Sequence, residues 1–187
     1  MIFGIGKNKT GTRSLACALE SIGMTVSHSD TDNADRVRQL LSDPYWKPFD
    51  EFDVYLDGPL WMVPSLLREH FPDAKFILTT RDPDQWITSR MIHVLSNRIV
   101  YRDEAWQDLP ATKADRDEFV RHNEDMREMF DGDPHFLEID LTTGDQWAQL
   151  ALFLDIPIDT IAGVEFPRRN SADWRIAQIL KHLKANE

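Results

Sequence analysis

The chain opens with MIFGIGKNKTGTRSLACALESIG, residues 1–23, and this stretch decides the fold. Its first five residues are almost all apolar, and Leu15, Leu19 and Ile22 then recur at helical spacing before Gly23. The segment therefore predicts a short buried strand, a glycine-rich turn, and a helix that ends at the glycine. A strand that runs through a turn into a helix is the first unit of a parallel α/β sheet.

The same alternation of strand and helix patterns continues along the rest of the chain. Further strands are predicted at residues 25–28, 53–57, 75–80 and 135–139. Helices are predicted at residues 32–41, 61–70, from 83 to beyond 89, and at 114–130, 146–154 and 176–183. An irregular polar stretch is expected at 101–113 and an extended connection at 158–170. We therefore expect one domain, residues 1–187, with a three-layer α/β fold whose mainly parallel central sheet is flanked by helices.

Composition limits the classes of function. The 187 residues carry a formal net charge of -11, which argues against broad binding to nucleic acid or to anionic membranes. No apolar run approaches the roughly 20 residues of a spanning helix, and the N-terminus lacks the layout of a signal peptide. The single Cys17 excludes an intramolecular disulfide and fits a reducing compartment. We expect a cytoplasmic protein without membrane insertion, in which a local positive site holds any anionic ligand.

The turn after the first strand combines glycines, lysines and hydroxyls at a predicted helix start. Gly6 and Gly11 permit tight turns, backbone amides can surround an anion, and the helix dipole favours negative charge there. The alternative is a capped turn whose lysines are only solvated. The glycine spacing matches a nucleotide triphosphatase loop, but Thr12 and Arg13 stand where that loop has Lys and Ser or Thr. Lys9 instead precedes the second glycine, which indicates a ligand other than magnesium-bound ATP.

Two motifs resemble sulfotransferases. KTGTRSL, residues 9–15, resembles the 5′-phosphosulfate loop of that family, and FILTTRDPDQWITS, residues 76–89, resembles its 3′-phosphate site. In the second motif Arg81 ends a strand and Ser89 follows eight residues later. Later segments resemble the later strand, helix and tail of the family, and the run GTRSLACALESIG at 11–23 with the stretch DGP at 57–59 resembles a small, poorly characterised subgroup of it. The resemblance implies a P-loop-like sulfotransferase fold with PAPS (3′-phosphoadenosine 5′-phosphosulfate) as co-substrate and PAP as product.

The resemblance also assigns binding residues. It implies that PAPS is bound by Lys9, Thr10, Gly11, Thr12, Arg13, Ser14, Arg81 and Ser89. Lys9 would contact the bridging oxygen and stabilise the departing diphosphate, with Lys7 as the rival ammonium; the alternative for Lys7 is a solvent-facing lysine at the loop entrance. From its position, Arg81 can hold a phosphate through paired charged hydrogen bonds at the carboxyl edge of the sheet. Its alternative is an ion pair with Asp82 or Asp84.

The base that takes the acceptor's proton has two candidates, Asp57 and His28. Each ends or follows a predicted strand and should therefore face the same sheet edge as Lys9. The alternative for Asp57 is a turn-capping residue before Gly58, and the alternative for His28 is a structural histidine. The other histidines show no metal-ligand spacing, so no metal site is predicted.

These observations favour a sulfotransferase that moves the sulfuryl group of PAPS to a hydroxyl or amine of a small-molecule or glycan acceptor. Nucleic acid is not an expected partner. Two alternatives remain open from the residues alone. One is a magnesium-dependent P-loop nucleotide kinase or phosphatase, in which Asp53 or Asp57 would serve the metal. The other is a non-catalytic relative that keeps the nucleotide-binding fold.

Overall fold

The computed structural model describes residues 1–43, 49–101, 112–169 and 171–185. In this part of the chain, five parallel strands form one sheet in the order β2-β3-β1-β4-β5. The strands are β1 (Ile2–Gly4), β2 (Val26–His28), β3 (Val54–Leu56), β4 (Lys75–Thr80) and β5 (Phe136–Asp140). The predicted parallel sheet is thus confirmed, with every predicted strand present. The irregular stretch predicted at 101–113 falls largely outside the described residues.

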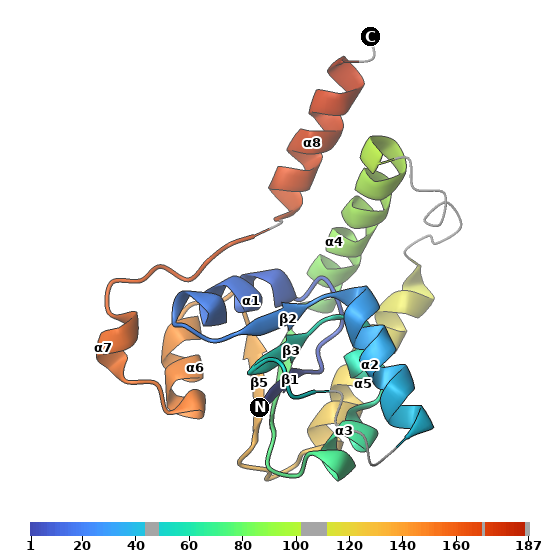
Figure 1. Ribbon diagram of the computed structural model, residues 1–187. Coiled ribbons are helices and arrows are strands. Elements are labelled where there is room, and N and C mark those ends of the chain that lie inside the picture. Colours follow the sequence, from blue (N-terminus) through green and yellow to red (C-terminus); the bar gives the residue numbers. More distant parts are fainter. Residues whose placement is uncertain (44–48, 102–111, 170, 186–187) are drawn as a thin grey trace.

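The helices connect these strands and lie on both faces of the sheet (Figure 1). They are α1 (Thr12–Ser21), α2 (Asp30–Ser42), α3 (Pro64–His70), α4 (Pro83–Ser96), α5 (Lys113–Met129), α6 (Gln146–Leu154), α7 (Ile158–Ile161) and α8 (Ala172–Lys184). A 3-10 helix, η1 (Gly58–Met62), precedes α3, and a π-helical turn, η2 (Asn97–Tyr101), follows α4.

Two predicted boundaries were wrong, and one predicted cap is confirmed. The helix expected over residues 61–70 is divided into η1 and α3, because Pro64 takes the first position of a new helix. The connection expected to be extended over 158–170 contains the short helix α7. Asp82 caps α4 as predicted, since its side chain accepts hydrogen bonds from two backbone amides of the first turn.

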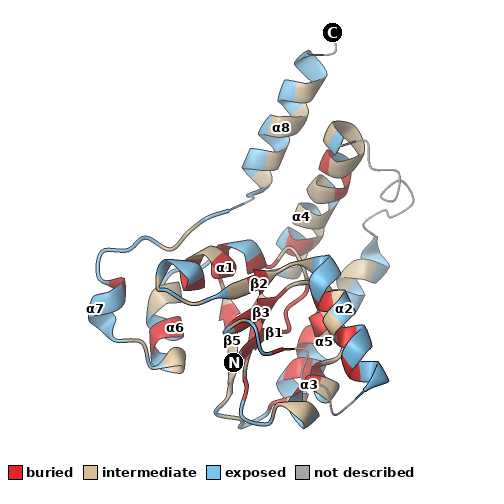
Figure 2. Cartoon of the chain, in the orientation of Figure 1, coloured by how far each residue is buried: buried red, intermediate tan, exposed pale blue. Residues whose placement is uncertain are grey.

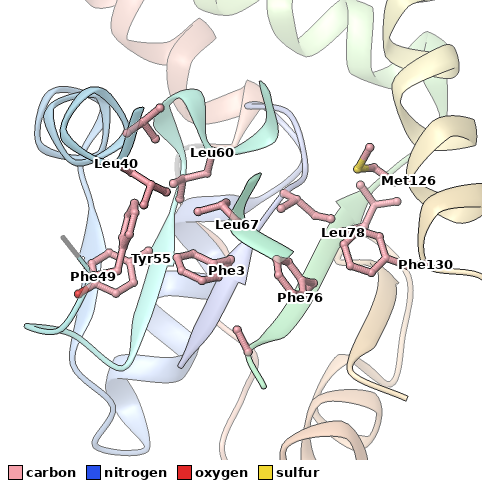
Figure 3. Packing of buried hydrophobic residues seen from close by; sticks show 13 residues of the cluster. Phe3, Leu40, Phe49, Tyr55, Leu60, Leu67, Phe76, Leu78, Met126 and Phe130 are labelled. Carbon is pink, nitrogen blue, oxygen red and sulfur yellow. The ribbon is translucent and has the colours of Figure 1, made fainter. Parts of the chain in front are cut away.

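Strand side chains alternate between two apolar layers. On β1, Ile2 packs with the residues of α1 and α6, whereas Phe3 packs on the opposite face with residues of α2, α3 and α5. Figure 3 shows the second layer, in which Phe3 lies between Tyr55 and Phe76, at centroid distances of 5.8 Å and 5.8 Å. The buried residues coloured in Figure 2 concentrate on the strands and on the helix faces turned toward them. These two layers around the sheet make the predicted three-layer fold.

The strand order fixes the place of a ligand site. β1 lies between β3 and β4, and the chain leaves β1 toward β2 but leaves β4 toward β5. The loops after β1 and β4 therefore diverge, and in open parallel sheets such a divergence opens a crevice at the carboxyl ends of the strands. The predicted phosphate loop follows β1, and Arg81 directly follows β4.

The last helix lies away from the sheet. α8 packs beside α4, and both helices project beyond the sheet (Figure 1). None of the described residues of α8 is buried. Within the described ranges, no helix is both long and apolar enough to cross a membrane. The expectation of one domain over residues 1–187 stays a prediction.

Candidate active site

A cavity of about 430 Å³ opens at the carboxyl edge of the sheet, where the crevice was expected. Its wall includes residues from the loops after β1, β3, β4 and β5 and from the start of α8. Of the residues predicted for the site, the cavity brings together Lys9 to Ser14, His28, Asp57 and Arg81. Ser89 does not line it.

The loop between β1 and α1, residues 5–11, is fastened tightly to β4. A Cβ atom at Gly6 would lie 2.2 Å from Thr79 Oγ1 and 2.4 Å from the Thr79 carbonyl oxygen, so only glycine fits there. Thr10 Oγ1 lies 2.6 Å from Thr79 Oγ1 and donates to the carbonyl oxygen of Lys7 over 2.6 Å. The Thr10 hydroxyl is thus used inside the protein.

Lys9 and Lys7 point to different surroundings. Lys9 lines the cavity with a positive φ of 72°, and burial followed by the nearby Arg175 charge lowers the pKa of Lys9 to about 8. Lys7 is buried, forms an ion pair with Glu118, and places its ammonium 4.3 Å from the ring centroid of Trp61. The reading of Lys7 as solvent-facing was wrong, because α5 and η1 cover it. Only Lys9 of the two lysines lines the cavity.

Arg81 binds the loop and the first turn of α4 through its guanidinium. Its Nη1 donates to the carbonyl oxygen of Lys9 over 3.1 Å, and its Nη2 donates to Gln85 Oε1 over 3.3 Å. Its Nε is buried and has no hydrogen-bond partner within the described part of the chain. The described residues give Arg81 no ion pair either, since Asp82 caps α4 and Asp84 pairs with Arg116.

Ser89 lies beside the cavity on the same helix that Arg81 precedes. It lines a neighbouring depression together with Arg81, Asp84, Gln85, Thr88 and Ala172. Arg81 lines both this depression and the cavity. The structure thus places the two residues of the second motif on one continuous surface.

The two candidate bases touch each other. His28 Nε2 lies 3.3 Å from Asp57 Oδ2 and 3.2 Å from Thr12 Oγ1. Thr12 Oγ1 in turn donates to Asp57 Oδ2 over 3.4 Å. Burial and the charge of Asp30 raise the pKa of Asp57, although His28 and Lys9 act in the opposite direction. Asp57 is also the N-cap residue of η1, where its side chain makes no capping hydrogen bond.

Arg175 and His93 are among the residues of the cavity wall that sequence reasoning missed. Arg175 enters from α8, and burial lowers its pKa. His93 enters from α4, where burial and the charges of Lys9 and Arg175 lower its pKa to about 3, so the imidazole stays neutral. His93 follows Ser89 by one helical turn, and that spacing is a signal that could have found it. Nothing local to Arg175 distinguishes it from a solvated helix arginine.

Positive charge gathers around the cavity although the chain as a whole is acidic. The acidic lining residues are Asp30, Asp57 and Asp173. The basic lining residues are Lys9, Arg13, Arg81, Arg168, Arg169 and Arg175. The tail that carries two of these arginines is tied to α1, because the backbone N–H of Arg169 donates to Ser14 Oγ over 3.0 Å. This is the local positive site that the net charge of -11 required.

Comparison with known proteins agrees with the geometry. The family model described as the sulfotransferase domain matches residues 1–174 of the chain. The chain belongs to the sulfotransferase family. It is also 31% identical over 102 residues to "Ava biosynthesis cluster protein M" of Aspergillus versicolor, an alignment that covers 46% of this chain and 39% of that protein. The chain thus matches well under two thirds of that relative's length.

The family match ends one residue before Arg175. The loop residues, the two candidate bases and Arg81 all lie inside the matched part of the chain, whereas nearly all of α8 lies outside it. Among the described residues, no group of three or more His, Cys, Asp or Glu side chains is placed to hold a metal ion. The expectation of a site without metal stays a prediction.

Proposed function

We propose that this protein transfers the sulfuryl group of PAPS to a hydroxyl or amine of a small-molecule or glycan acceptor and releases PAP. One observation carries the proposal: the glycine-rich loop, Arg81 and the His28–Asp57 pair open into one basic cavity at the switch point of the sheet. Phosphates bind well where backbone amides, a helix N-terminus and cations converge.

The residues present fit PAPS. Lys9 and the amides of residues 10–14 would hold the 5′-phosphosulfate, because they surround the N-terminus of α1. Arg81 and Ser89 would hold the 3′-phosphate, because Arg81 lines both the cavity and the depression beside Ser89. PAPS, when bound, supplies the sulfuryl group and the leaving diphosphate.

Lys9 supplies the charge that the departing oxygen needs. Its pKa of about 8 keeps the ammonium mostly protonated at neutral pH. As in phosphoryl transfer, charge develops on the leaving oxygen in the transition state, and a fixed cation beside that oxygen lowers the barrier. The half-buried position of Lys9 strengthens this interaction relative to a solvated lysine.

Asp57 takes the acceptor's proton, and His28 orients it. A carboxylate whose pKa is raised by burial is a better base than an ordinary surface carboxylate. His28 Nε2 and Thr12 Oγ1 both lie within 3.4 Å of Asp57 Oδ2, which restricts the rotation of the carboxylate. The acceptor hydroxyl or amine would then approach from the cavity side.

Transfer from labelled PAPS to a panel of phenols, alcohols and amines tests the proposal. We expect Asp57→Asn to abolish transfer to the acceptor found, with PAP affinity within a few fold of wild type, and His28→Asn to be milder. If Asp57→Asn turns over normally and His28→Asn is inactive, the two roles are exchanged. Loss of transfer in EDTA would instead favour the magnesium-dependent alternative.

We place the reaction in the cytoplasm, supported by the single Cys17.

A further inference from the structure

Asp57 has an unusual backbone conformation. Its φ is 69° and its ψ is -171°, a region that only glycine occupies readily. Such a conformation is strained and persists only where the surroundings enforce it. The next residue, Gly58, also has a positive φ, of 66°. The turn after β3 must therefore be held from outside.

Asn33 of α2 holds this turn from one side. The residue is fully buried, and its Nδ2 donates to the carbonyl oxygen of Leu56 over 2.8 Å and, at longer range, to that of Asp57 over 3.4 Å. Its Oδ1 accepts a hydrogen bond from Ser27 Oγ over 3.3 Å. One amide side chain thus ties α2 to the carboxyl ends of both β2 and β3. A buried amide with its groups satisfied is costly to disturb.

Asp30 precedes Asn33 by three residues on α2 and holds the turn after β3 through its carboxylate. Its Oδ1 accepts from the backbone N–H of Gly58 over 2.8 Å. A Cβ atom at Gly58 would lie 3.2 Å from Asp30 Cα and 3.2 Å from Asn33 Cβ, so α2 approaches the turn closely because residue 58 is glycine. Ser29 caps the helix start by accepting from the N–H of Asp32. These contacts hold the first turn of α2 against the turn that contains Asp57.

We propose that Asp30 and Asn33 are positioning residues, which hold Asp57 in its strained conformation with the carboxylate turned toward His28 and Thr12. The proposal rests on the proposed role of Asp57 as base. Asn33 has no carboxylate that could accept the proton, and Asp30 Oδ1 is engaged by the backbone N–H of Gly58.

Asp30 also influences the pKa of the Asp57 carboxylate. The charged groups around Asp57 are Asp30 from α2, His28 from β2 and Lys9 from the loop after β1. After burial, the negative charge of Asp30 is the largest influence that raises the pKa of Asp57. Removing that charge must therefore lower the pKa of Asp57 and move the rise of activity with pH to lower pH.

The direct test is titration of the Asp57 carboxyl carbon by NMR in protein labelled with carbon-13 at aspartate, with the resonance assigned by its loss in Asp57→Asn. Asp30→Asn keeps an oxygen that can accept from Gly58 but removes the charge. Asp32→Asn removes an exposed charge from the same helical turn and serves as the control. We expect the pKa of Asp57 to fall in Asp30→Asn and to stay near the wild-type value in Asp32→Asn. Equal shifts in both variants, or none in Asp30→Asn, would overturn the electrostatic role.

The positioning role is tested by turnover with labelled PAPS and the acceptor found in the screen. Asn33→Ala removes both donated hydrogen bonds, and we expect kcat to fall by about tenfold or more while PAP affinity stays within threefold, as for a misplaced catalytic group. A parallel loss of PAP affinity would make Asn33 a general structural residue. If Asn33→Ala does not fold, Asp30→Asn still decides through the titration and its pH profile.

The outcomes separate this inference from the proposed function. If Asp57→Asn is fully active, Asp57 is not the base, and the role proposed for it fails whatever Asp30 does. If Asp57→Asn is inactive but Asn33→Ala and Asp30→Asn keep wild-type kcat and the Asp57 pKa is unchanged, the proposed function stands and only the positioning role fails.

Discussion

The two walls of the cavity are built in different ways. The wall at the sheet edge is buried and hydrogen-bonded: Thr10 in this wall is 1% exposed, Asn33, which supports the turn after β3, is 0% exposed, and both join elements distant in sequence. The opposite wall comes from α8, which has no buried residue in its described part and leaves Trp174 43% and Leu180 53% exposed. Figure 2 shows this contrast between the sheet and the projecting helix.

The contrast indicates a division of labour. Groups that must be placed accurately for chemistry are on the sheet wall, where burial and hydrogen bonds make local opening costly. α8 contributes the charge of Arg175 from a helix with few buried contacts, so its local opening costs little free energy. Catalysis should therefore depend steeply on the sheet wall and weakly on α8.

The largest effect is expected at Lys9. Lys9→Met should lower turnover by roughly 30- to 1000-fold, about 2–4 kcal/mol in barrier, because it removes a cation that acts on the leaving group. PAP affinity should change much less. Kinetics with labelled PAPS and calorimetry with PAP measure the two effects separately. A loss confined to PAP binding would mean that Lys9 binds the nucleotide but does not stabilise the leaving group.

A smaller effect, on ligand binding, is expected at Arg81, and Arg175 of α8 serves as the comparison. Arg81→Ala should weaken PAP by roughly one to two decades, as expected for a charged hydrogen-bond pair worth about 1.5–3 kcal/mol. It should weaken adenosine 5′-phosphosulfate less, because that ligand lacks the 3′-phosphate. Arg175→Gln should affect both ligands equally and mildly, since Arg175 lies near Lys9. Equal loss of both ligands in Arg81→Ala would contradict the assignment of the 3′-phosphate site.

The smallest effect concerns stability, and it compares one helix cap from each wall. Ser29 caps α2 and Ser171 caps α8 by the same kind of hydrogen bond to a backbone N–H. Ser29→Ala should lower the free energy of unfolding by about 1 kcal/mol, measured by urea denaturation. Ser171→Ala should leave it nearly unchanged and only speed hydrogen exchange in α8. Similar losses of global stability in both variants would mean that α8 unfolds together with the sheet.

The same contrast explains what the sequence could reveal. The strands, the glycine-rich loop and the cap at Asp82 follow from local patterns, so they were predictable. Lys7 could not be placed, because its burial depends on Glu118 and Trp61, both distant in sequence. Arg175 could not be found either, because only the packing of α8 beside α4 brings it to the cavity.

The contact between Asp57 and His28 could be predicted in part. Both residues were predicted at the same sheet edge from the strands that they follow, which the structure confirms. Their pairing depends on β2 and β3 being neighbours, with His28 opposite Leu56 in the register. Strand order depends on packing over the whole domain, so the sequence around His28 or Asp57 does not indicate which strands are neighbours. The two candidates therefore looked like alternatives, although they are partners.

The central claim is that the cavity is built for a nucleotide with phosphates at both the 3′ and 5′ positions. Calorimetric titration of the wild-type protein with PAP, ADP and ATP, with and without magnesium, tests it most directly. We predict that PAP binds at least tenfold more tightly than ADP or ATP and that magnesium does not change this order, because Arg81 and Ser89 would receive the 3′-phosphate. Tighter binding of ATP in the presence of magnesium than of PAP would contradict the account.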